Sequence, residues 1–178
     1  AMRAPKVGLG GNFGLVSRES MLLANNTLLV VAAGSVLLGT LYPLFLDALN
    51  LGKISVGPPY FDSVFVPLMT PTIFLMGIGP LARWKEASLP DLATRLKWAF
   101  GVSIVTALLL PFVMGTWTPM IAFGLALALW VLTTSAVNLQ TRLASTKGSL
   151  GHRLASQPRG YYGMLLAHCG VAVFIIGV

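Results

Sequence analysis

The chain has 178 residues, of which 56% are hydrophobic and 10% are charged, and its formal net charge is +7. Soluble domains usually carry about 25% charged residues, so this composition excludes a water-soluble fold, which could not cover its surface. The positive charge could indicate a nucleic-acid-binding surface, but no basic run is interleaved with aromatic residues, and cytoplasmic loops of membrane proteins collect Lys and Arg. We therefore predict an all-α, polytopic transmembrane bundle, because spans in a bilayer satisfy their backbone hydrogen bonds as helices.

Five windows of the sequence approach the roughly twenty apolar residues that a membrane-crossing helix needs. We predict a cytoplasmic lead-in over residues 1–20 and a transmembrane helical region over 21–178, with spans at about 21–46, 61–82, 98–115, 119–137 and 161–178. Pro67 and Pro71 lie in the second span, where a packed kink is favoured over a transporter-like break. The Gly-rich start and the apolar run up to Val178 suggest a piece of a longer chain.

The basic residues are distributed unevenly between the two ends of the predicted spans. Lys53 is alone in the connection between the first two spans, and no basic residue lies between the third and the fourth. The other eleven of the 12 lie in the N-terminal segment and in the two remaining connections: Arg3, Lys6, Arg18, Arg83, Lys85, Arg95, Lys97, Arg142, Lys147, Arg153 and Arg159. Because positively charged loops stay cytoplasmic, we predict a cytoplasmic N-terminus and a last span that enters the membrane from the cytoplasm.

His168 stands out because it lies inside the last predicted span, seven residues after Tyr161. Ionisable side chains inside a membrane are costly and are functional candidates by default. A neutral imidazole can donate a lone pair to iron, and the small residues Gly163, Ala167 and Gly170 would leave room for a flat macrocycle. Small residues also permit close helix packing, so the residues alone favour a haem ligand and a histidine hydrogen-bonded to another helix equally.

The other polar residues in or near the spans are assigned simpler roles. Asn25 and Asn26 are expected to form hydrogen bonds between helices, and His152 is expected to be a solvated loop residue. Cys169 is the only cysteine, which excludes an internal disulfide, and it points about 100° away from His168 around a helix. The sequence shows no carboxylate pair, nucleophile–base set or metal-ligand cluster.

Several blocks of sequence, in order along nearly the whole chain, resemble one family. They are SRESMLLANNTLLVVAAGSVLLGTLYPL from Ser17, GKISVGPPYF from Gly52, GIGPLARW from Gly77 and GMLLAHCGVAVFIIG from Gly163. Together they are similar to the cytochrome c biogenesis protein CcmF and its NrfE relatives, the membrane subunit of a haem lyase. The tryptophan-rich outer segment of that family and its other three histidines have no counterpart in this sequence, so the resemblance covers a middle-to-late portion of the family pattern.

The resemblance implies part of a haem lyase in the bacterial inner membrane, with haem b as cofactor and His168 as one of its two axial ligands. Arg83, which follows the second span, is a candidate contact for a haem propionate. The implied partners are the haem chaperone CcmE, CcmH-type thioredoxin-like and apocytochrome-binding subunits, and apocytochrome c, to which haem is attached covalently.

This stretch alone is not expected to be active, because the tryptophan-rich haem-handling segment is missing. Two other functions stay open. One is a small-molecule or ion transporter, and the other is a membrane assembly scaffold without haem.

Overall fold

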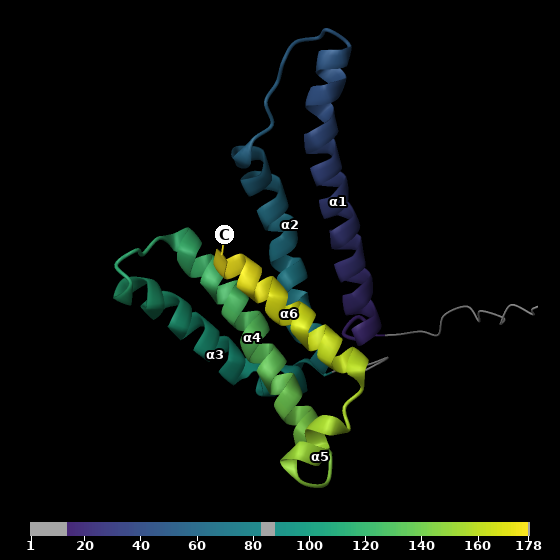
Figure 1. Ribbon diagram of the computed structural model, residues 1–178, viewed down its shortest axis with the longest axis vertical. Helices are drawn as coiled ribbons and strands as arrows, with labels where there is room; N and C mark the ends of the chain where they lie inside the picture. Colours follow the sequence, from purple (N-terminus) through teal and green to yellow (C-terminus); the bar gives the residue numbers. More distant parts are fainter. Residues whose placement is uncertain (1–13, 83–87, 178) are drawn as a thin grey trace, which may run out of the picture.

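The computed structural model describes residues 14–82 and 88–177, and every regular element within these ranges is a helix (Figure 1). In chain order they are α1 (Arg18–Ala48), α2 (Pro58–Ile78), a short 3₁₀ helix η1 (Gly79–Leu81), α3 (Leu89–Val113), α4 (Pro119–Ser145), α5 (Leu150–Ala155) and α6 (Arg159–Gly177). Five segments, namely α1, α2 with η1, α3, α4 and α6, are long and apolar enough to cross a membrane. The predicted fold class, an all-α bundle with five spans, is confirmed.

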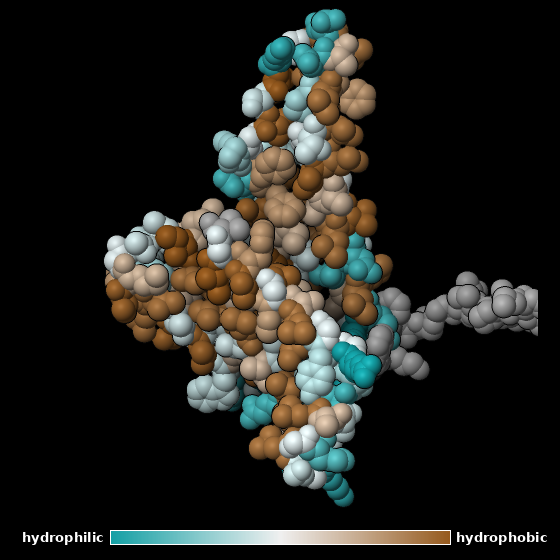
Figure 2. Space-filling view, viewed as in Figure 1, coloured by the Kyte–Doolittle hydropathy of each residue, from teal (hydrophilic) through white to brown (hydrophobic). Residues whose placement is uncertain are grey.

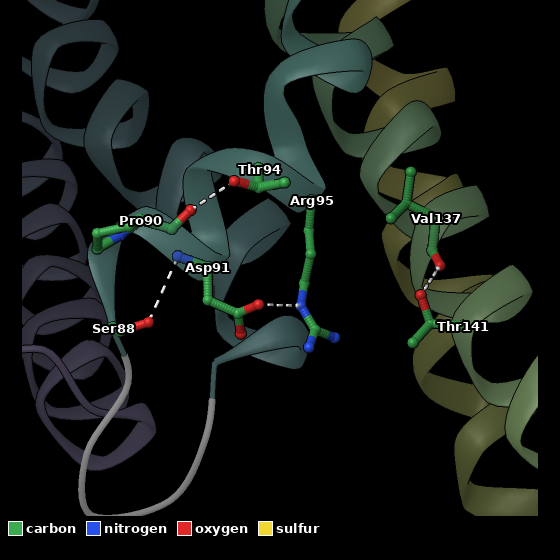
Figure 3. A network of polar contacts seen from close by, with 7 residues as sticks. All are labelled: Ser88, Pro90, Asp91, Thr94, Arg95, Val137 and Thr141. Atoms are coloured by element: carbon green, nitrogen blue, oxygen red, sulfur yellow. Dashed lines mark hydrogen bonds and ion pairs between the residues drawn. The ribbon is translucent and has the colours of Figure 1, made fainter.

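Polar residues just outside the apolar windows determine where α3 begins (Figure 3). The Ser88 hydroxyl accepts a hydrogen bond from the backbone N–H of Asp91 at 3.4 Å, which caps the helix. The Asp91 carboxylate lies near the positive end of the helix dipole and pairs with Arg95 at 3.1 Å. The helix therefore starts at Leu89, nine residues before the apolar stretch predicted as the third span. Hydropathy locates only the part of a helix that is apolar, whereas its capping residues determine its length.

The connection before α6 contains more helix than expected. α4 continues to Ser145, eight residues beyond the fourth apolar window, and is followed by the six-residue helix α5. α5 is capped by Ser149, whose hydroxyl accepts a hydrogen bond from the N–H of His152 at 3.4 Å. The side chain of His152 is exposed, as predicted, although its backbone belongs to this short helix and not to a loop.

The helices form two arms that meet at one end and diverge toward the other (Figure 1). α1 and α2 pack as one antiparallel pair, and α4 packs between α3 and α6 in the second arm. The C-terminal half of α2 contacts α4 and so joins the arms. The main buried cluster lies at this junction and is drawn from α2, α3, α4 and α6: Ile73, Leu96, Ala99, Ala128, Trp130, Val131 and Ala172.

Close contact between α1 and α2 depends on a glycine. A Cβ added at Gly39 would lie 2.6 Å from Cε1 of Tyr60, so the tyrosine ring rests directly on the α1 backbone. The Tyr60 hydroxyl donates a hydrogen bond to the carbonyl of Ser35 at 2.9 Å. Away from such contacts the surface is largely apolar, and the hydrophilic residues gather at the α1–α2 connection and at the end near α5 (Figure 2). This distribution is expected for helices that face lipid along their length.

Candidate functional site

His168 lies on the helix that packs along α4, and two contacts fix the register of this pair. At one end, the Tyr161 hydroxyl donates a hydrogen bond to Oδ1 of Asn138 at 2.9 Å. At the other end, a Cβ on Gly124 would lie 3.9 Å from Cγ2 of Ile175. The two contacts are separated by 14 residues on each helix. α4 and α6 are therefore antiparallel and keep a constant register between these points.

This register places His168 at the centre of the α4–α6 contact. His168 is seven residues from both Tyr161 and Ile175, which puts it level with the fully buried Val131 of α4. Seven residues of α-helix bring the chain almost back to the same face, about 10 Å further along the axis. The imidazole thus begins on the stripe of α6 that faces α4, and its side chain is half-buried. As the tenth of the 19 residues in α6, it also lies midway along the helix.

No hydrogen bond or ion pair involves the His168 side chain within the described residues. This finding weakens the alternative in which the histidine is bonded to a neighbouring helix. Both ring nitrogens remain free of protein partners there, so one is available as a lone-pair donor to a metal.

The small residues near His168 do not surround its imidazole. Gly163 and Gly170 lie about 140° and 200° around the helix from His168, on the side that faces away from α4. Both are exposed, and a Cβ added at either would meet no atom within 4 Å. Ala167 is also exposed, about 100° away. The free space that the sequence predicted therefore exists along the outer face of α6 and not beside the imidazole.

Between His168 and the start of α6, three helices meet in a polar contact that was not predicted from the sequence. Nδ2 of Asn138 donates a hydrogen bond to the carbonyl of Pro80 at 3.2 Å, while its Oδ1 accepts from Tyr161. The guanidinium of Arg142 lies over the Tyr161 ring, 4.5 Å from its centroid. These contacts join the end of α2, through η1, to α4 and to the start of α6. Asn138 is a polar residue in an apolar helix and could have been noticed, but its partners are 58 and 23 residues away in the sequence.

Trp130 makes the second link between α2 and α4. Its ring stacks on Phe74 with centroids 5.0 Å apart, and its Nε1 donates to the carbonyl of Phe74 at 3.1 Å. Gly77 allows this approach, because a Cβ there would lie 2.5 Å from Trp130 Nε1 and 2.9 Å from Thr134 Oγ1. The two arms are therefore held together by two contacts, one through Asn138 and one through Trp130.

The remaining candidates do not join His168. Asn25 and Asn26 form no hydrogen bond to another helix in the part of the chain that the structure describes, and Oδ1 of Asn25 is buried without a partner. The helix α2 is continuous through Pro67 and Pro71. Cys169 is a partly buried free thiol. Arg83 falls in 83–87, outside the described residues.

The donor set suits a haem better than a simple metal ion. Among residues 14–82 and 88–177, no group of three or more His, Cys, Asp or Glu side chains could hold a metal ion. A haem needs fewer protein ligands, because its porphyrin supplies four nitrogen ligands to the iron and the protein supplies only axial ones. One half-buried imidazole without a competing hydrogen bond meets that requirement for a single axial position.

Comparison with known proteins identifies the family. The chain is 41% identical over 184 residues to the cytochrome c-type biogenesis protein CcmF of Pseudomonas fluorescens, which covers 99% of this chain and 26% of that protein. It is 38% identical to the cytochrome c-type biogenesis protein CycK of Rhizobium meliloti, over 100% of this chain and 27% of the relative. The chain belongs to the CcmF/CycK/NrfE family.

The fold agrees with this membership. A solved structure described as the cytochrome c haem lyase CcmF superposes with a TM-score of 0.67 and 27% identity, over 92% of this chain and 25% of that chain. A scan against protein-family models found no match. The chain thus spans about a quarter of the length of the CcmF relatives that it matches. As a family member with five spanning helices, it is a multi-pass protein of the bacterial inner membrane.

Proposed function

We propose that this chain is part of the cytochrome c maturation haem lyase, in which His168 provides one axial ligand to a membrane haem b. The observation that carries the proposal is an imidazole midway along a spanning helix, half-buried and without a hydrogen-bond partner among the described residues. An ionisable residue at that depth is energetically costly, so its presence favours a functional role. Membership of a family whose relatives are named for cytochrome c biogenesis supports a role in that process.

The residues of this chain would contribute binding and positioning. His168 would hold the iron through a ring nitrogen, and the contacts of Asn138 and Tyr161 would fix the height of the imidazole relative to α2 and α4. When bound, haem b would supply one-electron chemistry that supports covalent attachment of a second haem to apocytochrome c. The partners in this proposal are the haem chaperone CcmE, CcmH-type thioredoxin-like and apocytochrome-binding subunits, and apocytochrome c.

Arg83 stays in the proposal as a contact for a haem propionate. It follows Ala82, which ends the segment that the Pro80–Asn138 hydrogen bond ties to α4. A guanidinium close to a propionate would stabilise its negative charge. We expect Arg83→Ala to lower haem b content or to shift its midpoint potential in the purified protein. If both stay at wild-type values, Arg83 has no part in binding haem.

Transport is less well supported than haem binding. A transporter of the broken-helix type uses unwound backbone near the middle of the membrane to hold its substrate. The helix α2, which contains both prolines, is instead helical from Pro58 to Ile78.

The test compares two histidine variants of the protein purified in detergent from its own membranes, with any bound subunits retained. We expect His168→Ala to lose the sharp bands of reduced haem b in the optical spectrum. His152→Ala is the matched control, since that side chain is exposed on α5 and should leave the spectrum unchanged. Unaltered bands in the His168 variant would reject it as a ligand, and a wild-type protein without any haem bands would reject the proposed function.

A further inference from the structure

The connection between α4 and α6 is folded and presents a defined surface. Nε of Arg153 donates a hydrogen bond to the carbonyl of Gly148 at 2.7 Å. The hydroxyl of Tyr162, in the first turns of α6, donates to the carbonyl of Leu154 at 2.7 Å. Nε2 of Gln157 reaches the hydroxyl of Thr146 at 3.4 Å. These contacts hold α5 against the ends of both long helices, so the side chains that it displays keep a fixed arrangement.

This surface carries positive charge that no carboxylate among the described residues pairs with. Arg142, Lys147 and Arg159 are exposed, and none of them forms an ion pair within the described residues. The printed sequence contains no Asp or Glu from position 92 to position 178. Two other cations of the chain do have acidic partners: Lys53 lies 3.9 Å from Asp47, and Arg95 lies 3.1 Å from Asp91 (Figure 3).

One of these cations is already oriented. The Arg142 guanidinium lies over the Tyr161 ring, 4.5 Å from its centroid. The guanidinium donates no hydrogen bond and forms no ion pair among the described residues, so its N–H groups are available to the oxygens of an anion. Arg159 is two residues before Tyr161 in the chain, so two arginines flank the start of α6.

Exposed leucines lie in the same connection, three and seven residues after Lys147. Leu150 is 68% exposed and Leu154 is 38% exposed. They are four residues apart on α5 and therefore share one face of this helix. In Figure 2, apolar side chains lie among hydrophilic ones at this end of the molecule. Cations next to an apolar face are the pattern of a segment that lies in the interface of a membrane.

We propose that the α4–α6 connection binds anionic phospholipid at the membrane surface. Arg142, Lys147 and Arg159 contact the headgroup phosphates, while Leu150 and Leu154 enter the boundary between headgroups and acyl chains. An acidic protein would complement the charges only, whereas an anionic lipid complements the charges and the leucines together. The connection joins two spanning helices, α4 and α6, so it lies at the surface of the bilayer. This inference does not depend on haem binding.

The test measures which lipids stay with the purified protein. The protein is exchanged into mixed micelles that contain equal amounts of phosphatidylglycerol and phosphatidylcholine, and retained lipids are counted by native mass spectrometry. A variant with Arg142→Gln, Lys147→Gln and Arg159→Gln is compared with a control that has Lys53→Gln, Arg95→Gln and Lys97→Gln. Both remove three positive charges. Each basic residue near an anionic membrane surface contributes about fivefold to binding, so we expect the first variant to lose on the order of a hundredfold in preference for phosphatidylglycerol.

The control variant is expected to keep the wild-type preference, because its cations lie outside the connection. Equal losses in both variants would show that only total charge matters, and an unchanged preference in the first variant would overturn the proposal. Loss of a bound acidic protein with unchanged lipid retention would assign the surface to that protein instead. If the triple variant does not fold, Lys147→Gln alone gives the same comparison, because Lys147 is exposed. We expect this single variant to lose a few-fold in preference for phosphatidylglycerol. An unchanged preference would contradict the proposal.

Discussion

Gly77 is the residue on which the contact between α2 and α4 depends most directly. A Cβ at this position would lie 2.5 Å from Nε1 of Trp130 and 2.9 Å from Oγ1 of Thr134. The indole cannot move away easily, because it stacks on Phe74 and meets Phe100 edge-on at 5.9 Å. Its Nε1 also holds the carbonyl of Phe74. The absence of a side chain at Gly77 therefore allows a hydrogen bond, an aromatic stack and a close helix crossing at once.

We predict that Gly77→Ala destabilises the protein by about 1–3 kcal/mol, the usual range for overpacking a tight interior contact. Thermal unfolding in detergent, followed by circular dichroism, measures the effect. Gly101→Ala is the matched control, because a Cβ there meets nothing within 4 Å and Gly101 lies in the interior of α3. It should leave the unfolding midpoint unchanged or raise it slightly, since alanine favours helix over glycine. Equal midpoints for the two variants would contradict the close approach at Gly77.

At this scale the sequence singled out His168 correctly as an ionisable residue within a span, but not Gly77 or Asn138. The reason is the range of the interactions. A histidine in an apolar stretch is visible without knowledge of its partners, because its desolvation cost depends on the local stretch alone. The importance of Gly77 and Asn138 comes from Trp130 and Pro80, which lie more than 50 residues away in the chain. A single sequence contains no signal that pairs such residues.

The helices themselves were predictable at the scale of the element, whereas their packing was not. Long apolar stretches predicted five spans, and the structure has five helices of suitable length. The α4–α6 register depends on where Asn138 meets Tyr161 and where Ile175 meets Gly124. Hydropathy is similar all round these helices, so no amphipathic stripe indicated which face packs. The sequence therefore predicted how deep His168 lies in the membrane, but not which residue of a neighbouring helix it faces.

Cross-linking tests this register. In a Cys169→Ser background, we predict that cysteines at Gly124 and Ile175 form a disulfide under mild oxidation, because the side chain at 175 lies 3.9 Å from the position of a Cβ at 124. The readout is a shift in mobility on a gel after cleavage within the 146–158 connection. Cysteines at Gly124 and Ile176 form the matched control, since position 176 points about 100° away and is exposed. If the control pair cross-linked efficiently instead, the register would be wrong, and His168 would not lie on the stripe of α6 that faces α4.

The distribution of charge belongs to the whole molecule. Five helix ends gather where the two arms meet (Figure 1). They are the start of α1, the end of α2 with η1, the start of α3, the end of α4 and the start of α6. The three segments rich in Lys and Arg adjoin these helix ends. This is expected, because successive connections alternate between the two ends of the spans. The divergence of the arms had no signal in the sequence, because it follows from the contact of only part of α2 with α4.

The orientation of the chain in the membrane stays a prediction, and accessibility to a reagent tests it. The connection between α1 and α2 carries one lysine, which is paired with Asp47, whereas the connection between α4 and α6 is strongly basic. Because basic loops are retained in the cytoplasm, we predict that the first connection is on the outer side and the second on the inner side. Single cysteines at Leu51 and Lys147, both exposed positions, report on the two sides in a Cys169→Ser background.

A membrane-impermeant maleimide should label Leu51→Cys in intact spheroplasts and Lys147→Cys only after the membrane is permeabilised. The opposite pattern would invert the chain, so that His168 would be reached from the outer side along α6. Labelling of both positions in intact spheroplasts would be incompatible with three spans, α2 to α4, between them. An odd number of crossings requires that the two positions lie on opposite sides, so the comparison tests the span count and the direction in one experiment.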